Sequence, residues 1–293
     1  MEKLVLISLI LLTKNLLFST GVEIINIPVG NSSSLANEKA IINNYGFSLF
    51  TNPAVLININ SNYTIEYNRL FYYNKTTYDI LSLTSKSFDK FCAGLSFGRF
   101  TSGEINLRNI DGIPTGENFE YSMILSSLGM GVKLSEDDYN VLNFGFSGVI
   151  ILEKIDTENI FFGYNTGLLH KLKIKTKFLK GILLGGSING VSTDKKLNYN
   201  ASFGLQTGNS IVFIGYEGFI LSNNEKIKIG TMLNLYTSKD LKKYFNLNIG
   251  YQTNTNYLSS GIDFRIYNFG LCYSFGNHKY LGALHSLQII LFI

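Results

Sequence analysis

From about residue 60 onward, apolar and polar residues alternate along the chain with a period of two. The clearest case is residues 245–252, where Phe, Leu, Ile and Tyr alternate with Asn, Asn, Gly and Gln. Similar alternation occurs at residues 142–147, 198–205 and 269–275. Because successive side chains of a strand point to opposite faces, this pattern predicts many β-strands, each with one apolar face.

Short polar stretches separate the alternating runs. Gly208 and Asn209 form a candidate two-residue hairpin turn, since Gly-Asn pairs fit the backbone of tight turns. Polar tetrads at residues 135–138, 222–225 and 253–256 are expected to lie in water. Residues 101–118, which contain three glycines and one proline, are the longest expected loop.

The spacing of these runs predicts a strand count. Residues 60–293 hold about fourteen strands at roughly sixteen residues per strand and turn, and bacterial barrels favour even numbers. The expected strands begin near residues 63, 77, 90, 119, 139, 160, 180, 198, 210, 226, 244, 259, 269 and 284. The last run ends flush with the sequence, as expected of a strand that pairs with the first one and closes a barrel.

The composition of the polar face separates a membrane barrel from a soluble sandwich. Only 16% of the residues are charged, against about 25% in ordinary domains. The polar positions are mainly Asn, Ser, Thr and Gly, which suit a crowded lumen better than a water-exposed surface. We therefore predict an all-β fold, a transmembrane antiparallel β-barrel over residues 61–293, with a soluble two-sheet sandwich as the alternative.

Charge and cysteine content exclude several classes of function. A net charge of +4 over 293 residues is too small to indicate nucleic-acid binding. Cys92 and Cys272 stand 180 positions apart, so they suggest neither a disulfide framework nor a metal site, and both are expected to be small apolar wall residues. No cofactor is predicted.

The N-terminus resembles a secretory leader. Lys3 precedes a short apolar run at residues 4–12, and Ser19, Thr20 and Gly21 offer small residues for cleavage. Residues 1–21 are therefore expected to be a cleaved signal peptide, with an uncleaved anchor helix as the alternative.

Residues 22–60 do not alternate. Ser32, Ser33 and Ser34 could cap a short helix over residues 35–42, and a turn at Asn52-Pro53-Ala54 follows before the first strand. We expect this segment to form a short helical plug within the barrel.

At this turn the sequence resembles the PorV/PorQ family, within the FadL-like superfamily of outer-membrane barrels. Further similar motifs follow in order, and the resemblance covers nearly the whole mature chain: Gly94-Leu95-Ser96-Phe97-Gly98, Gly103-Glu104-Ile105, Asn165-Thr166-Gly167-Leu168-Leu169, Gly261-Ile262-Asp263-Phe264 and Tyr280 to Leu287. The sequence departs from the family pattern in two places. The Asn-Pro-Ala turn lacks the usual following Gly, and the terminal residue is Ile293 rather than an aromatic.

The resemblance implies a fourteen-stranded barrel in the outer membrane whose N-terminal segment enters the lumen. FadL-like members pass hydrophobic small molecules through the lumen and out by a gap in the wall. PorV-type members act as carriers or gates in type IX secretion, which makes exported proteins the partners under the second hypothesis. Membrane lipid, lipopolysaccharide and the barrel-assembly machinery are implied partners in either case.

Four charged residues interrupt apolar or small runs, namely Glu66, Glu217, Asp263 and Arg265, and of these Glu66, Asp263 and Arg265 are expected to face inward. Since buried charges usually pair, ties between the wall and the plug are the favoured interpretation, with a transport path as the alternative. Together with Asn52, Pro53 and Ala54 the three inward-facing residues form the candidate passage or plug site.

No catalytic residue is predicted. Residues 94–98 match the G-x-S-x-G pattern of hydrolases, but that motif requires a strand-to-helix turn and this one lies within a β-like run. A lipid hydrolase is therefore the weakest of the three hypotheses. His170, His278 and His285 lack metal-ligand spacing, so no metal is expected.

Four lysines alternate with other residues at positions 171–177. Charges on the lipid face at the midplane would cost about 2–4 kcal/mol each, so this ribbon should lie outside the hydrocarbon. It is expected to be a hairpin with solvated lysines, or a basic strip that meets anionic headgroups.

Overall fold

The computed structural model describes residues 27, 29–72, 76–108, 113–154, 158–176, 178–191, 197–219, 222–238, 242–278 and 282–293. The expected signal peptide, residues 1–21, lies outside the described residues. Among the residues that are described, no helix is long and apolar enough to cross a membrane.

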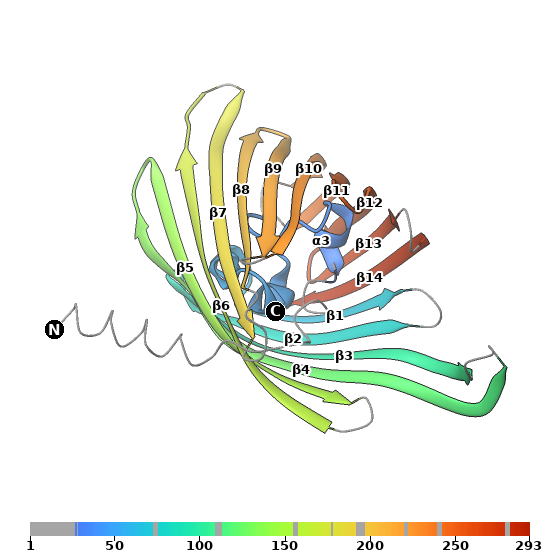
Figure 1. The fold of residues 1–293 in the computed structure, drawn as a ribbon. Helices are drawn as coiled ribbons and strands as arrows, with labels where there is room; N and C mark the ends of the chain where they lie inside the picture. Colours follow the sequence, from blue (N-terminus) through green and yellow to red (C-terminus); the bar gives the residue numbers. More distant parts are fainter. Residues whose placement is uncertain are drawn as a thin grey trace.

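The strands form one closed antiparallel barrel, in which each strand pairs with its neighbours in sequence and β1 pairs with β14 (Figure 1). Tyr63 and Ile293 complete the closure, because the N–H of each donates to the carbonyl of the other, both at 2.9 Å. The prediction of a fourteen-stranded barrel is confirmed, and the two-sheet sandwich is excluded.

The strands vary in length and follow one another through short connections. Their bounds are β1 Tyr63–Phe71, β2 Thr77–Phe88, β3 Phe91–Arg108, β4 Pro114–Glu136, β5 Asn140–Lys154, β6 Glu158–Lys173 and β7 Leu179–Val191, then β8 Asn198–Thr207, β9 Ser210–Phe219, β10 Ser222–Thr237, β11 Lys243–Gln252, β12 Tyr257–Ile266, β13 Phe269–His278 and β14 Gly282–Phe292. The expected starts lie within two residues of these, except at β4 and β10.

The two-residue period separates an outer face from an inner one. In β11 the apolar side chains of residues 245, 247, 249 and 251 point outward, and residues 246, 248, 250 and 252 are buried inside. The wall is therefore sorted as the sequence pattern predicts.

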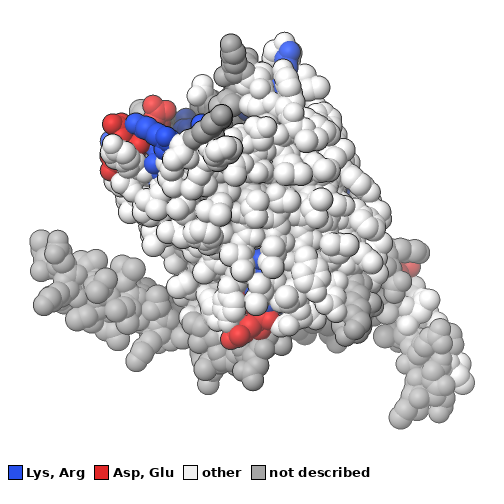
Figure 2. All heavy atoms as spheres, turned by 90° about the horizontal axis from the view of Figure 1, so that it is seen from above, with Lys and Arg blue, Asp and Glu red and all other residues white. Residues whose placement is uncertain are grey.

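The outer face is apolar and fully accessible. Leu128, near the middle of β4, is 67% exposed, and Phe97, Ile150 and Phe162 are also largely exposed. Figure 2 shows a broad band of the wall that is nearly free of Lys, Arg, Asp and Glu, with charges gathered toward its two ends. Such a band matches the surface that a barrel presents to hydrocarbon.

The lumen is filled by residues 29–60, here called the lumen segment. It contains α3 (Gly30–Ser34) and two 3-10 helices, η1 (Tyr45–Phe50) and η2 (Pro53–Asn58), all enclosed by the ring of strands (Figure 1). Phe47, Leu49, Phe50, Val55 and Leu56 are fully buried.

The helix expected over residues 35–42 is wrong, since α3 ends at Ser34 and the chain turns with positive φ at Ala36 (53°) and Asn37 (62°). A wall side chain and a side chain of the segment itself supply hydrogen bonds that a helix would have made between backbone groups. Ala36 N–H donates to Ser259 Oγ at 3.0 Å, and the Glu38 carboxylate accepts the N–H groups of residues 40 and 41.

The long loop expected over residues 101–118 is also wrong. Strands β3 and β4 continue through most of it and extend past their neighbours as a hairpin (Figure 1). Register shifts between Thr101 and Glu104, and between Asn106 and Arg108, accommodate the extra residues. Gly103 and Gly116 sit in these shifts with positive φ of 68° and 82°, so they serve β-bulges rather than a loop.

The turns follow the predictions more closely. Gly208 and Asn209 join β8 to β9, and residues 253–256 form the turn after β11. Residues 222–225, expected as a polar turn, instead belong to the start of β10, where the pairing with β9 shifts between Ser222 and Lys226.

Candidate functional site

The Asn52-Pro53-Ala54 turn lies deep in the lumen at the start of η2. Asn52 Oδ1 accepts the N–H of Ala54 at 3.1 Å and so caps this helix, and Pro53 occupies its first turn, where no donor is needed. The Asn52 amide nitrogen also donates to the carbonyls of Ala40 (2.7 Å) and Leu168 (3.4 Å). The turn thus joins two parts of the lumen segment and contacts strand β6.

Glycines of the wall make room for this turn. A Cβ added at Gly145 of β5 would overlap the backbone of Pro53 and Ala54, and one at Gly167 of β6 would overlap the Asn52 side chain. These glycines define the recess that receives the turn. The sequence offered a signal for them, because both stand at inward positions of alternating strands.

Glu66 of β1 is buried and contacts the lumen segment directly. Its Oε2 accepts the N–H of Gly46 at 2.7 Å, while Oε1 accepts the side-chain amides of Gln288 (2.7 Å) and Asn68. One carboxylate therefore links β1, β14 and the start of η1.

Asp263 and Arg265, two residues apart on β12, have different surroundings. Asp263 Oδ2 accepts the side-chain amides of Asn31 (3.3 Å) in the lumen segment and Asn246 (3.2 Å) in β11. Arg265 contacts the wall instead. Its Nε donates to Tyr267 O at 2.9 Å, and its guanidinium lies 3.6 Å from the centre of the Phe292 ring. The structure thus brings Glu66 and Asp263, but not Arg265, against the lumen segment.

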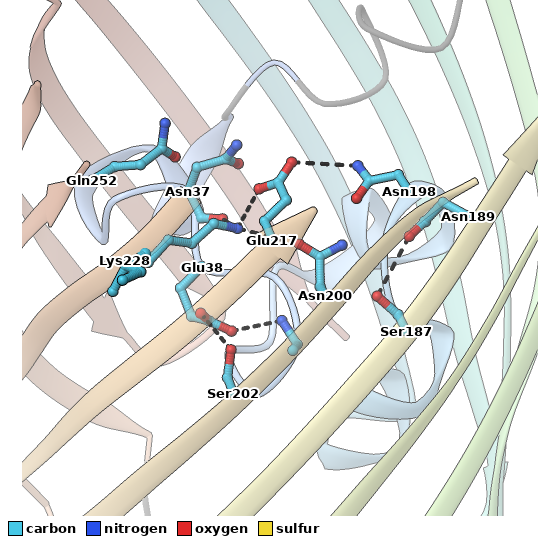
Figure 3. Close-up of polar contacts among 12 residues, drawn as sticks. Asn37, Glu38, Ser187, Asn189, Asn198, Asn200, Ser202, Glu217, Lys228 and Gln252 are labelled. Atoms are coloured by element: carbon cyan, nitrogen blue, oxygen red, sulfur yellow. Dashed lines mark hydrogen bonds and ion pairs between the residues drawn. The ribbon is translucent and has the colours of Figure 1, made fainter. Parts of the chain in front are cut away.

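A buried ion pair lies between β9 and β10, and of its two members the sequence singled out Glu217 but not Lys228. Lys228 Nζ is 2.5 Å from Glu217 Oε2, and both side chains are at most 1% exposed (Figure 3). Asn198 Nδ2 donates to the other Glu217 oxygen at 3.3 Å. Lys228 could have been noticed in the sequence, since it stands between Ile227 and Ile229 at an inward position.

Amide and hydroxyl side chains hold the second half of the lumen segment. Asn165 Nδ2 donates to Leu49 O at 2.8 Å, and Asn189 Nδ2 donates to Thr51 O at 2.8 Å and to Phe50 O at 3.2 Å. Ser127 and Ser147 also donate to Leu49 O. The uncharged polar side chains of the inner face therefore donate hydrogen bonds to backbone carbonyls that would otherwise be buried without partners.

Two adjoining cavities remain at the end of the lumen where β1 begins and β14 ends. The first is about 710 Å³ and lies between the lumen segment at Asn43 and Tyr45 and strands β8 to β12. The second, about 570 Å³, shares those two residues and extends toward Lys133 and Lys171. This end of the lumen can therefore hold a small molecule.

A third pocket lies in the wall itself. It is about 410 Å³, mostly apolar, and is lined by Tyr236, Lys243, Tyr244, Phe245, Phe264, Arg265 and Ile266. Three of these residues, Tyr236, Tyr244 and Arg265, also line the 710 Å³ cavity. The wall pocket adjoins an irregularity of β10, where the pairing with β11 shifts between Asn234 and Tyr236.

The lysines of the expected basic ribbon are distributed between these features. Lys173, at the end of β6, bonds to Glu136 Oε1 at 3.0 Å and to Asp137 O at 3.1 Å. Lys171 lines the 570 Å³ cavity, and Lys177 lies outside the described residues. Lys173 and Glu136 therefore form their ion pair at the rim of the barrel, as expected of charged groups that must lie outside the hydrocarbon.

The serine and two of the three histidines that were considered as catalytic or metal-binding candidates form hydrogen bonds with neighbouring residues of the barrel. Ser96 lies within strand β3, where its hydroxyl donates to Gly46 O at 2.8 Å, so the G-x-S-x-G match lacks the strand-to-helix turn of a hydrolase. His170 bonds to Asn140 and His285 to Tyr273. In the part of the chain that the structure describes, no group of acidic residues, histidines and cysteines could hold a metal.

These features define a class of protein: a closed fourteen-stranded barrel with an apolar outer wall and a lumen filled by its own N-terminal segment. No known family model matches the sequence, and no curated protein does. Solved structures do match the fold. The Pseudomonas putida toluene transporter TodX aligns over 94% of this chain and 98% of its own, with a TM-score of 0.57 and 11% identity.

Two further solved structures give the same result. The Ralstonia pickettii toluene transporter TbuX covers 91% of this chain and 97% of its own, with a TM-score of 0.56 and 11% identity. A Pseudomonas aeruginosa FadL homologue covers 90% and 98%, with a TM-score of 0.53 and 10% identity. The chain therefore shares the fold of FadL-like barrels.

Proposed function

We propose that this protein is an outer-membrane barrel of the PorV/PorQ, FadL-like type that binds hydrophobic small molecules and passes them across the membrane. Its chemistry is binding and passage, and no bond is broken. The apolar outer band supports residence in lipid, with lipopolysaccharide as a neighbour. Delivery would use the leader at residues 1–21 and the barrel-assembly machinery. The fold shared with toluene transporters supports a hydrophobic cargo.

The observation that carries this proposal is that the wall pocket and the lumen cavity share lining residues. Tyr236, Tyr244 and Arg265 line both, so an apolar molecule in the lumen lies beside an apolar pocket in the wall. Phe245, Phe264 and Ile266 give that pocket a surface that favours apolar ligands. In this route the cargo leaves past the first residues of β11, next to the irregularity in β10.

Uptake into liposomes tests the proposal. Purified protein should accelerate entry of a small fluorescent aromatic molecule above the rate of protein-free liposomes. A cysteine placed at Phe245 and alkylated with a bulky maleimide should slow that entry, because the adduct fills the wall pocket. Phe275→Cys on β13 is the matched control, since both phenylalanines are similarly exposed on the outer face and Cys92 and Cys272 are buried.

Uptake no faster than in empty liposomes would contradict hydrophobic passage. Equal inhibition by the adducts at positions 245 and 275 would reject the route through the wall pocket while leaving passage itself intact.

The projecting β3–β4 hairpin supports a second candidate, a carrier or gate subunit of type IX secretion that binds exported proteins. Ile105 and Ile113 of this hairpin are 46% and 60% exposed. The hairpin as a whole extends beyond the neighbouring strands (Figure 1). Exposed apolar side chains on a projecting element favour protein binding. Replacing residues 103–118 by a short turn should then reduce secretion of exported proteins and leave dye uptake unchanged. Unchanged secretion would reject this candidate.

A further inference from the structure

The two halves of the lumen segment differ in the charges that they carry, since residues 29–44 contain Glu38 and Lys39 whereas residues 45–60 contain no charged residue. The second half, residues 45–60, packs apolar side chains such as Phe47 and Leu56 beneath strands β1 to β6. The first half, residues 29–44, lies against β8 to β14, where Leu35, Ile41 and Ile42 join an apolar cluster and charged and polar side chains of the wall add hydrogen bonds. The difference matters because a buried charge that loses its partner carries a large desolvation penalty, which the entry of water relieves.

The strongest of these polar contacts centre on Lys228. Its Nζ pairs with Glu217 and also donates to Asn37 O of the first half at 2.8 Å and to Asn200 Oδ1 at 3.3 Å (Figure 3). A wall cation is thus aimed at the backbone of the lumen segment, at a residue with positive φ.

Two charged residues of the first half complete the cluster. Glu38 Oε2 accepts the Ser202 hydroxyl of β8 at 2.8 Å (Figure 3). Lys39 is 1% exposed and lies close enough to Glu217 for their charges to attract. Two cations and two carboxylates therefore meet within the barrel: Glu38 and Lys39 come from the lumen segment, Glu217 from β9 and Lys228 from β10, and Lys226 of β10 lies near enough to act on the same cluster.

We propose that Glu38, Lys39, Glu217 and Lys228 form a latch that holds the first half of the lumen segment in place, while the second half is a permanent anchor. The desolvation penalty of these buried ions offsets much of their mutual attraction. The cluster therefore stabilises the segment only while all its members are present and water is excluded. Once one partner is lost, water can solvate the remaining charges. The first half then leaves its place against β8 to β10, and the adjoining cavities join into a water-filled path through the lumen.

Conductance in planar bilayers tests the latch, independently of any cargo. The wild-type protein should conduct little, whereas E217Q and K228M should each give discrete current steps. Asn165→Leu is the matched control, because it removes a neutral hydrogen bond from the wall to the anchor half. It should remain as closed as the wild type.

Thiol labelling reports the motion itself. A cysteine at Ala40, fully buried in the first half, should be labelled at least about tenfold faster in E217Q and K228M than in the wild type, since a lost ion-pair partner destabilises the buried site strongly. A cysteine at Phe47 of the anchor half should remain slow in every variant.

Several outcomes would overturn the proposal. In the first, E217Q and K228M fold, as judged by heat-modifiable migration, but they conduct no more current and are labelled no faster than the wild type. Another is equal opening by N165L, which would show that the segment is held as one unit. If the charge variants fail to fold, Ser202→Ala removes only the tie to Glu38. It should still speed labelling at position 40, and no change there would reject the latch.

Discussion

The outer and inner faces of this barrel place different requirements on the residues of the same alternating sequence. The outer face needs only apolar side chains, and neighbouring residues there are largely interchangeable. The inner face must fit one particular segment, with glycines where the backbone approaches and amides where a carbonyl needs a partner. Position by position, the outer face is specified by polarity and the inner face by shape and hydrogen bonding.

The largest expected effect comes from placing a charge on the outer face. Leu128→Arg should destabilise the folded barrel by about 2–4 kcal/mol in lipid vesicles, because the guanidinium would lie near the middle of the hydrocarbon. Leu134→Arg, on the same strand near the rim, should cost about 0–1 kcal/mol. Urea unfolding in vesicles measures both, and equal costs would show that this face does not cross a bilayer.

An added side chain on the inner face should have the next largest effect. Gly145→Val would force its methyl groups into the backbone of Pro53 and Ala54, and we expect a loss of about 1–3 kcal/mol. Gly148→Val is the matched control on β5, because a Cβ there meets nothing within 4 Å. Equal unfolding midpoints for the two variants would mean that the lumen segment does not occupy this recess.

The outer face could be predicted from the sequence, whereas the structure of the lumen segment at the inner face could not. The period of two is a property of each strand alone, so alternation gave the outer face, the strand count and most strand starts. The lumen segment depends on partners far along the chain, such as Ser259 for Ala36 and Lys228 for Asn37. Local pattern therefore predicted a helix over residues 35–42, whereas in the structure side chains of the wall and of the segment itself accept these backbone N–H groups.

The site residues show the same division. Glu66 and Asp263 could be chosen from sequence because charge is rare at inward positions, and both contact the lumen segment. Their partners could not be chosen, since the backbone N–H of Gly46 and the amide of Asn31 carry no sequence signal of pairing. Glycines 103 and 116 made residues 101–118 resemble a loop, because a glycine in a β-bulge and a glycine in a loop look alike in sequence.

The smallest expected effect lies outside the wall, in the turn between β4 and β5. The N–H groups of Tyr139 and Asn140 donate to the Asp137 carboxylate, both at 2.7 Å, and lower its pKa below the usual 3.8. The stabilisation is present above that usual value and is lost as pH falls through the lower pKa of the folded state.

Asp137→Asn should therefore lower the urea midpoint slightly at neutral pH, and the difference from the wild type should shrink as the pH falls below about 4. Asp138→Asn in the same turn serves as the control. A difference that grew with acidity would contradict this assignment.

The most direct measurement compares two adjacent residues of β9, Phe213 and Ile214. The chain contains no Trp, so Phe213→Trp and Ile214→Trp each provide a single fluorescent reporter at nearly the same depth. Phe213 is 2% exposed on the inner face, and Ile214 is 50% exposed on the outer face. In vesicles of lipids brominated on their acyl chains, fluorescence at position 214 should be strongly quenched and that at position 213 should be nearly unaffected. Equal quenching at both positions, or quenching at neither, would contradict a barrel whose outer face meets hydrocarbon and whose inner face encloses the lumen segment.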